Sequence, residues 1–135
     1  MVADRLERLR SIPLFADLSR AALEQVARAA HEVEIPAGRV IIEPRTKGSG
    51  MFVIEDGTVG VETRSRKTDL GPGDFVGELA LLNSSSERTA RVRAKTDVRC
   101  LAIDRHDFED LLEANPKIAI TMLATLAERL DRATS

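Results

Sequence analysis

The stretch GDFVGELALLNSSSERTARVRA, Gly73 to Ala94, decides how this chain folds and what it holds. A glycine and a glutamate lead into a short apolar run, a loop of small polar residues follows, and an arginine precedes a strand-like alternation. Gly77 lets the backbone turn sharply or approach a ligand, because glycine has no Cβ. The residues that follow it favour one helical turn, whose N-terminus presents unpaired N–H groups to an anion.

Two charged side chains in this stretch add to the chemistry of the loop. Glu78 is an acceptor for hydroxyl groups, and Arg88 carries a planar fork that suits a phosphate. Each also has a purely structural explanation, Glu78 as a first-turn helix acid and Arg88 as a solvated strand-edge arginine. Their order, with the serine-rich loop between them and strands on both sides, favours a site for a nucleotide with one phosphate.

The sequence around this stretch predicts many short strands. From His31 the apolar period is two, and Val- and Ile-rich runs alternate with glycine- and proline-containing turns. Asp56-Gly57, between two alternating runs, is a strong hairpin signal. Short strands at near-regular spacing predict an antiparallel sandwich or barrel. The strand segments are HEVEI, RVII, GMFVIEDG, TVGVET, RTARVRA and DVRCLAI.

Apolar residues recur at helical spacing both before and after the predicted strands. Residues 3–10 predict a short amphipathic helix with Leu6 and Leu9 on one face, and a second helix follows with Asp17 or Ser19 as its N-cap. Its buried stripe is predicted to be Leu18, Ala22, Val26 and Ala29.

After the strands, Asp104 is predicted to cap a helix whose apolar face holds Phe108, Leu111 and Leu112. Pro116 suits the first turn of the last helix.

The predicted fold class is therefore α+β, in one domain that spans residues 1–135. The predicted parts are a helical N-terminus (3–30), a β-core (31–103) and C-terminal helices (104–133).

Composition narrows the function. With 135 residues, 43% apolar and 31% charged, the chain can bury one core, and its net charge of −2 argues against a general nucleic-acid-binding surface. Cys100 is the only cysteine, so no intramolecular disulfide forms, and a reducing cytoplasm is predicted. No apolar run approaches eighteen residues, so we expect neither a signal peptide nor a membrane span.

Catalytic and metal-binding patterns are missing from the sequence. His31 and His106 are the only histidines, and they are far apart in the chain. A cupin-like metalloenzyme needs several histidines and a carboxylate at an open metal site. Cys100 lies in a core pattern, and no Ser/His/Asp arrangement has a recognisable spacing. We therefore expect no enzyme, no metal and no cofactor, with the cupin-like metalloenzyme as the remaining catalytic alternative.

The central stretch resembles the phosphate-binding cassette of cyclic nucleotide-binding domains. That family's pattern runs F-x-G-E-[LIV]-A-L-L, a short loop, then R-[TSA]-A-x-V, and residues 75–92 match it. MFVIEDGTVGV resembles the family's Y-x-I-x-x-G-x-V-x-V segment, with Phe52 in the aromatic place. The segment LFADLSRAALEQVARAAHEVEIPAGRVI resembles its opening helix and first strands. The segment DRHDFEDLLEANPKIAITMLATLAERL resembles its two C-terminal helices. The resemblance implies an antiparallel β-roll, a jelly-roll-like double-stranded β-helix, flanked by helices.

The resemblance also implies roles for particular residues. Glu78 would accept the ribose 2′-hydroxyl, and Arg88 would bind the exocyclic oxygens of the cyclic phosphate. The full implied ligand-binding set is Gly77, Glu78, Leu79, Ala80, Arg88, Thr89 and Ala90. The last helix would close over the base through Leu130, Arg132 and Thr134. The ligand predicted is cAMP, with cGMP as the alternative.

Two departures from the family pattern leave a rival interpretation open. Glu87 stands where many members have a proline, which places a negative charge beside a phosphate site. Pro44 and Arg45 replace an acidic, glycine-containing loop. The rival is the same fold acting as a protein-interaction module, without nucleotide or with another small anion.

The predicted function is a regulatory sensor that relays nucleotide binding through its C-terminal helices. The last helix, residues 116–133, has apolar residues on more than one side and predicts either packing on the β-core, a mobile lid or a homodimer seam. An effector domain, fused or separate, is the expected partner. TRSRKTD, which carries Arg64, Arg66 and Lys67, is predicted to be a solvated hairpin tip, with a partner contact as the alternative.

Overall fold

The computed structural model describes residues 2–42, 50–64, 66–77 and 90–134. Its helical elements are α1 (Val2–Arg10), the 3₁₀ turn η1 (Pro13–Phe15), α2 (Arg20–Ala29), α4 (Arg105–Ala114) and α5 (Pro116–Thr134). Its strands are β1 (His31–Ile35), β2 (Val40–Ile42), β3 (Gly50–Asp56), β4 (Val59–Glu62), β5 (Lys67–Leu70), β6 (Phe75–Val76), β7 (Arg91–Ala94) and β8 (Val98–Asp104). The chain divides into two compact units, residues 1–28 with 109–135 and residues 29–108.

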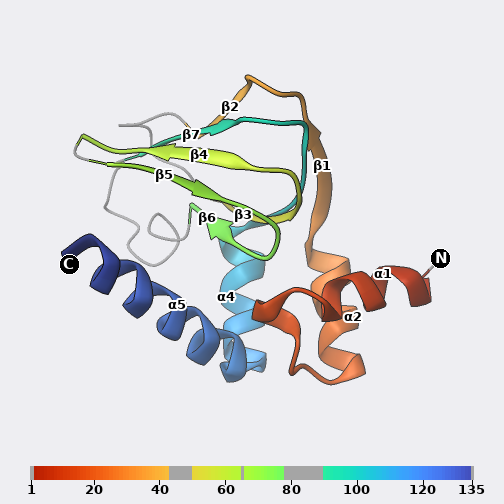
Figure 1. The fold of residues 1–135 in the computed structure, drawn as a ribbon. Coiled ribbons are helices and arrows are strands. Elements are labelled where there is room, and N and C mark those ends of the chain that lie inside the picture. The colour runs from red at the N-terminus through yellow and green to blue at the C-terminus, as the bar shows by residue number, and fades with distance from the viewer. Residues whose placement is uncertain (1, 43–49, 65, 78–89, 135) are drawn as a thin grey trace. The chain divides into compact units, whose positions relative to one another are not determined.

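The strand unit is an antiparallel β-roll made of two four-stranded sheets (Figure 1). Sheet A has the strand order β1-β8-β3-β6, and sheet B has the order β2-β7-β4-β5. Because side chains alternate along each strand, one face of each sheet supplies the apolar interior. The interior cluster is Ile42, Ile54, Val59, Val76, Val92, Ala94, Val98 and Cys100. The predicted α+β class and antiparallel roll are confirmed.

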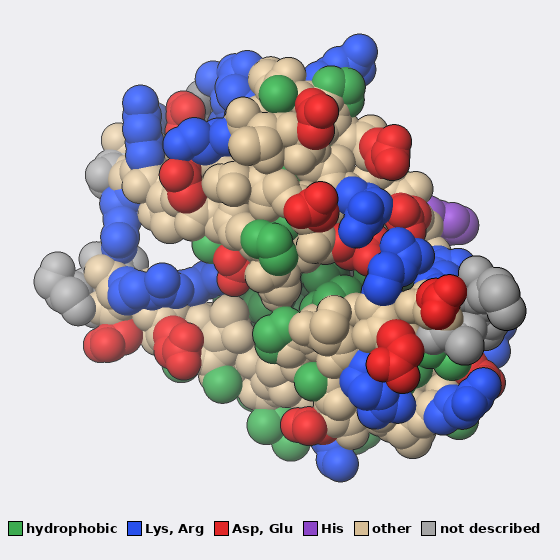
Figure 2. Space-filling view, turned by 45° about the vertical axis from the view of Figure 1, so that its right-hand side comes forward, with side chains coloured by type: hydrophobic (Ala, Val, Ile, Leu, Met, Phe, Trp, Pro, Cys, Tyr) green, Lys and Arg blue, Asp and Glu red, His purple; other side chains and the backbone are tan. Residues whose placement is uncertain are grey.

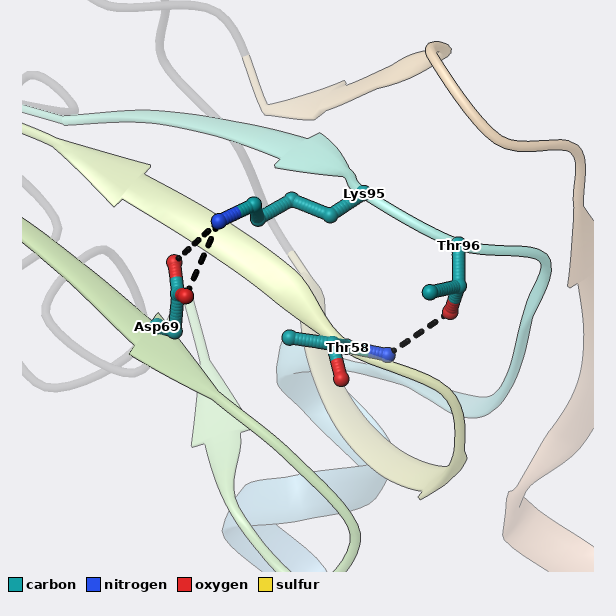
Figure 3. A network of polar contacts seen from close by, with 4 residues as sticks. All are labelled: Thr58, Asp69, Lys95 and Thr96. Atoms are coloured by element: carbon teal, nitrogen blue, oxygen red, sulfur yellow. Dashed lines mark hydrogen bonds and ion pairs between the residues drawn. The ribbon is translucent and has the colours of Figure 1, made fainter.

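The hairpin predicted at Asp56-Gly57 is wrong, because β3 pairs within sheet A and β4 within sheet B. The two residues form a corner between the sheets. Gly57 has φ +94, and its backbone lies against the turn that joins β7 to β8. There the amide of Thr58 donates to Oγ1 of Thr96 at 3.0 Å (Figure 3). The turn residues were identified correctly, but the chain on either side of them pairs with other strands.

A hairpin does form one turn later, between β4 and β5. Glu62 is paired with Lys67, and the tip closes where the amide of Thr63 donates to the carbonyl of Arg66 at 2.9 Å. Strand β5 was not predicted, because Lys67–Leu70 is mostly polar and exposed and shows no apolar alternation. Strand β6, only two residues long, also lies below what periodicity detects.

The helical unit follows the predicted spacing closely. Leu6 and Leu9 of α1 are buried, and Oγ of Ser19 accepts the amide of Ala22 at 3.2 Å, so Ser19 caps α2. Of the predicted α2 stripe, Leu18, Ala22 and Val26 are buried, whereas Ala29 is only half-buried.

The last helix packs against η1 through its N-terminal half. Ile118 and Met122 are buried there, and Asn115, in the turn before it, donates its side-chain amide to Oε1 of Gln25 at 3.2 Å.

The cap predicted for α4 is present as well. Oδ1 of Asp104 accepts the amide of Asp107 at 2.9 Å, which satisfies one of the orphan donors of the first turn. On the apolar face of α4, Phe108 and Leu111 are buried and Leu112 is half-buried.

Candidate functional site

The predicted cassette connects the two sheets of the roll. Strand β6, before it, belongs to sheet A, and strand β7, after it, belongs to sheet B. Val76 and Val92, one on each strand, are 4% and 2% exposed and lie in the same interior cluster. The segment between them therefore leaves one sheet and enters the other at the roll interior.

A tight turn fixes the entry to this segment. Oδ2 of Asp74 accepts the amide of Gly71 at 3.0 Å, and the amide of Asp74 donates to the carbonyl of Gly71 at 3.0 Å. The turn is tied to β3, because Ile54 donates its amide to the carbonyl of Asp74 and accepts the amide of Gly73, both at 2.8 Å. Four hydrogen bonds thus set the direction in which the chain leaves sheet A.

Gly77 is the first predicted site residue and the last one described before residues 78–89. Its φ of +88 lies in the left-handed region, which glycine adopts without a steric cost. Any other residue here would strain the backbone where the chain turns into the cassette. This conformation agrees with the sharp turn expected at Gly77, whereas its contact with a ligand stays a prediction.

The predicted polar site residues lie outside the described part of the chain. These are Glu78, Leu79, Ala80, Arg88 and Thr89, together with Glu87. At the other end of the connection, Ala90 is described and half-buried, directly before β7. Pro44 and Arg45, which mark the other departure from the family pattern, also lie outside the described residues.

Two apolar side chains stand beside the ends of the connection. Phe52 is the register partner of Val76, and Val61 is the register partner of Val92. Both are only partly buried, although they pack against the interior cluster. They give the roll interior an apolar wall next to the predicted site. Val61 was not among the predicted site residues, and its only signal in the sequence is the alternation of β4.

The thiol of Cys100 is an ionisable group in the interior of the roll, and its pKa is shifted there. Cys100 is 1% exposed, and burial, with a smaller contribution from the negative charge of Glu55, raises its pKa to about 11. The thiol is therefore protonated at neutral pH and is a poor nucleophile. In the described parts of the chain, no three His, Cys, Asp or Glu side chains are grouped as metal ligands.

The residues predicted to contact the base are at the end of α5. Leu130 is 66% exposed and Arg132 is exposed, whereas Thr134 is the last residue of the helix. They belong to the helical unit, and their predicted contact with a ligand stays a prediction. No described helix has the length and apolarity needed to cross a bilayer.

Comparison with known proteins decides what kind of site this is. The family model of the cyclic nucleotide-binding domain matches residues 32–115. The chain belongs to the cyclic nucleotide-binding domain family. The matched range contains β1 from its second residue onward, strands β2 to β8 and helix α4. It also contains the residues between β6 and β7.

The chain spans about a third to a half of the three proteins compared below, a potassium channel and two protein kinase A regulatory subunits. A cyclic nucleotide-gated potassium channel of Rhizobium etli is 40% identical over 88% of this chain, which spans 33% of that protein. The structure of cAMP-bound PfPKA-R has a TM-score of 0.83 and 25% identity, over 98% of this chain and 47% of that one. A protein kinase A regulatory subunit from Trypanosoma cruzi, described as cAMP-independent and bound to guanosine, has a TM-score of 0.79 and 29% identity, over 91% and 44%.

Proposed function

We propose that this domain is a sensor that binds a cyclic nucleotide, with cAMP as its ligand. The observation that carries the proposal is the match of the roll to the family model together with the intact pattern of residues 75–92. The geometry supports it: the connection between β6 and β7 begins and ends at an apolar interior, and Gly77 has the left-handed φ that a sharp entry requires.

Within this proposal each residue of the cassette has one role. Glu78 accepts the ribose 2′-hydroxyl, and Arg88 pairs with the exocyclic oxygens of the cyclic phosphate. Backbone amides of the loop complete the anion site. We propose that Phe52 and Val61, the register partners of Val76 and Val92, contact the less polar parts of the nucleotide. Leu79, Ala80, Thr89 and Ala90 shape the loop around it.

The output of the sensor is a change in its helices. The chain passes from one compact unit to the other after Arg28 and again within α4, so two short crossings link the roll to the helical unit. We propose that nucleotide binding shifts this linkage and closes the end of α5, with Leu130, Arg132 and Thr134, over the base. The ligand shifts the equilibrium only by its difference in affinity for the two arrangements.

The partners follow from the same interpretation. The domain regulates an effector, fused or separate, and has no catalytic role of its own; the lone buried cysteine fits a reducing, cytoplasmic setting. Ile120, Leu123 and Leu130 of α5 are 66%, 65% and 66% exposed. Together with Ala127 they recur in steps of three and four residues, the spacing of a coiled-coil seam. We propose a homodimer through Ile120, Leu123 and Ala127 of this stripe, which leaves Leu130 for the contact with the base.

A second candidate is the same domain with a different ligand. The guanosine-bound relative from Trypanosoma cruzi favours it, because a protein of similar fold and 29% identity is described there as cAMP-independent. Glu87 favours it too, since a carboxylate beside the phosphate site would weaken binding of an anion. In that case the domain would bind a neutral nucleoside or act through protein contacts alone.

Thermal unfolding with a panel of nucleotides separates the two candidates. We expect cAMP to raise the melting temperature of the wild type, because a ligand that binds only the folded state stabilises it by mass action. 5′-AMP, which lacks the cyclic phosphate, should raise it much less. Stabilisation by guanosine or adenosine alone, with none by cAMP or cGMP, would support the second candidate. Stabilisation by cGMP alone would support the sensor function, with cGMP instead of cAMP as the ligand.

A further inference from the structure

The outer face of sheet B carries a concentration of basic side chains that the proposed function does not use. In β7, Val92 and Ala94 point into the interior cluster, so alternation places Arg91 and Arg93 on the opposite face. Lys95 continues this row just after the strand. The register sets Arg93 beside Gly60 of β4, and the same row continues to β5.

Gly60, in the centre of this face, leaves room for the side chain of Lys95 to cross β4. A Cβ on Gly60 would lie 3.3 Å from Cδ of Lys95 and 3.8 Å from Oδ1 of Asp69. Because Gly60 has none, the Lys95 side chain lies across β4 and its Nζ reaches both carboxylate oxygens of Asp69, at 3.1 and 2.9 Å (Figure 3). One of the two acids on the face is thereby neutralised, and both partners remain about half exposed.

The other acid is also flanked by cations. Glu62 is the register partner of Arg91 on one side and of Lys67 on the other. We call these residues the basic face, and among the described residues it consists of Lys67, Arg91, Arg93 and Lys95 with the two acids Glu62 and Asp69.

The basic face contrasts with the rest of the molecule. Among the described residues of this face, four cations stand against two carboxylates, whereas the whole chain has a net charge of −2. Basic and acidic side chains both lie on the surface that Figure 2 shows. A partner with a negative surface is therefore attracted in one orientation and repelled in the others.

We propose that the basic face binds an anionic lipid bilayer. A sheet presents its outward side chains toward one plane, which matches a flat, charged surface. The four basic residues of this face fall within the range of about four to eight that mark binding to anionic membranes. Their long side chains can reach the headgroups without inserting into the bilayer. The face has no aromatic residue on which the bases of a single-stranded nucleic acid could stack, and the chain has neither Trp nor Tyr.

This binding would hold the roll against a membrane with sheet B facing the lipid. The attraction is electrostatic, so it falls steeply as salt shortens the Debye length. It does not depend on the cassette, and it is therefore independent of whether the domain binds cAMP.

Co-sedimentation of the full chain with vesicles tests the proposal. The probes are phosphatidylcholine vesicles and vesicles with about one third phosphatidylserine, each at low and high salt. The variant is Lys67→Gln with Lys95→Gln, two exposed positions of the basic face. The matched control is Arg28→Gln with Lys117→Gln, two exposed positions in the helical unit that change the net charge equally.

We expect the wild type to bind only the anionic vesicles and to be released by salt. Each basic residue near such a surface contributes about a fivefold factor, so the double variant should bind about 30-fold more weakly and the control should bind as the wild type does. Equal losses in the two variants would contradict a specific face. Binding of a polyglutamate peptide or duplex DNA by the wild type, without binding to anionic vesicles, would overturn the assignment of the partner. Unchanged melting temperatures show that both variants fold.

Discussion

Alanine substitutions at Gly57 and Gly38 would show how much the close packing at the corner between the two sheets contributes to stability. Both have a left-handed backbone, with φ values of +94 and +90. A Cβ on Gly38 would meet nothing within 4 Å, whereas one on Gly57 would lie 2.3 Å from the carbonyl oxygen of Asp97 and 3.0 Å from Cα of Val98. Both neighbours of Gly57 are backbone atoms, so the contact cannot be relieved by a side-chain rotation.

The expected costs follow from this difference. Gly38→Ala should lower the unfolding free energy by about 1–2 kcal/mol, because alanine is strained in the left-handed region. A few tenths of a kcal/mol are regained, because alanine also restricts the unfolded chain. Gly57→Ala should have the same backbone cost, and the turn at Asp97 must also move away from the new Cβ. That movement stretches the hydrogen bonds from Thr58 to Thr96 and from Lys95 to Thr58, each worth about 1 kcal/mol. We expect a loss of about 3–4 kcal/mol in the unfolding free energy.

The assay is urea unfolding of the two alanine variants and the wild type, followed by circular dichroism. The midpoint of Gly57→Ala should fall by more than twice the shift of Gly38→Ala, at an unchanged slope. Equal shifts would mean that the close approach of Gly57 to Asp97 does not determine the stability of the corner. A larger loss at Gly38 would refute the argument outright.

Three further predictions concern the interior and the helical unit. The unfolded thiol of Cys100 loses its proton near pH 9 and the buried one near pH 11, so the unfolding free energy should fall as pH rises through this window, and Cys100→Ala should flatten the fall. Asn115→Ala and Gln25→Ala should each cost about 1 kcal/mol, with a coupling of at least about 0.5 kcal/mol in the double variant, because their side chains share a hydrogen bond. Leu123→Glu should convert a dimer to a monomer in light scattering, because it places a charge in the exposed stripe of α5.

Each of these has its own contradicting result. Rapid labelling of Cys100 by a thiol reagent under native conditions would show that the thiol is not shielded. Additive costs at Asn115 and Gln25 would mean that the two residues act separately. A wild type that is monomeric at high concentration would contradict the proposed homodimer. It would not affect the proposed nucleotide site.

Local patterns in the sequence predicted most of the elements, because each has its own physical signal. Ser19 and Asp104 were identified as caps, and Pro116 as the start of the last helix, from short-range chemistry that the structure confirms. Phe75 and Gly77 were identified through a motif, and the position of Gly77 in the left-handed region agrees with its role there.

What the sequence did not predict depends on pairing between distant segments. Asp56-Gly57 has the composition of a hairpin, but the corner it forms is fixed by the turn near Asp97, some forty residues later in the chain. Lys67–Leu70 becomes a strand because β4 supplies its hydrogen-bonding partners, not because of its own side chains. The apolar wall formed by Phe52 and Val61 depends on the register of both strands with the ends of the cassette, which no local pattern encodes.

Calorimetric titration of cAMP, and of cGMP, into the wild type and Arg88→Ala tests the central claim most directly. Arg66→Ala is the matched control, since it removes the same charge from an exposed turn outside the cassette. The account predicts binding to the wild type and to the control. It also predicts a loss of about 30-fold to several-thousand-fold in affinity for Arg88→Ala, because a phosphate charge is left unpaired. Absence of heat for both nucleotides at millimolar concentration, or equal affinity in Arg88→Ala and the wild type, would contradict it.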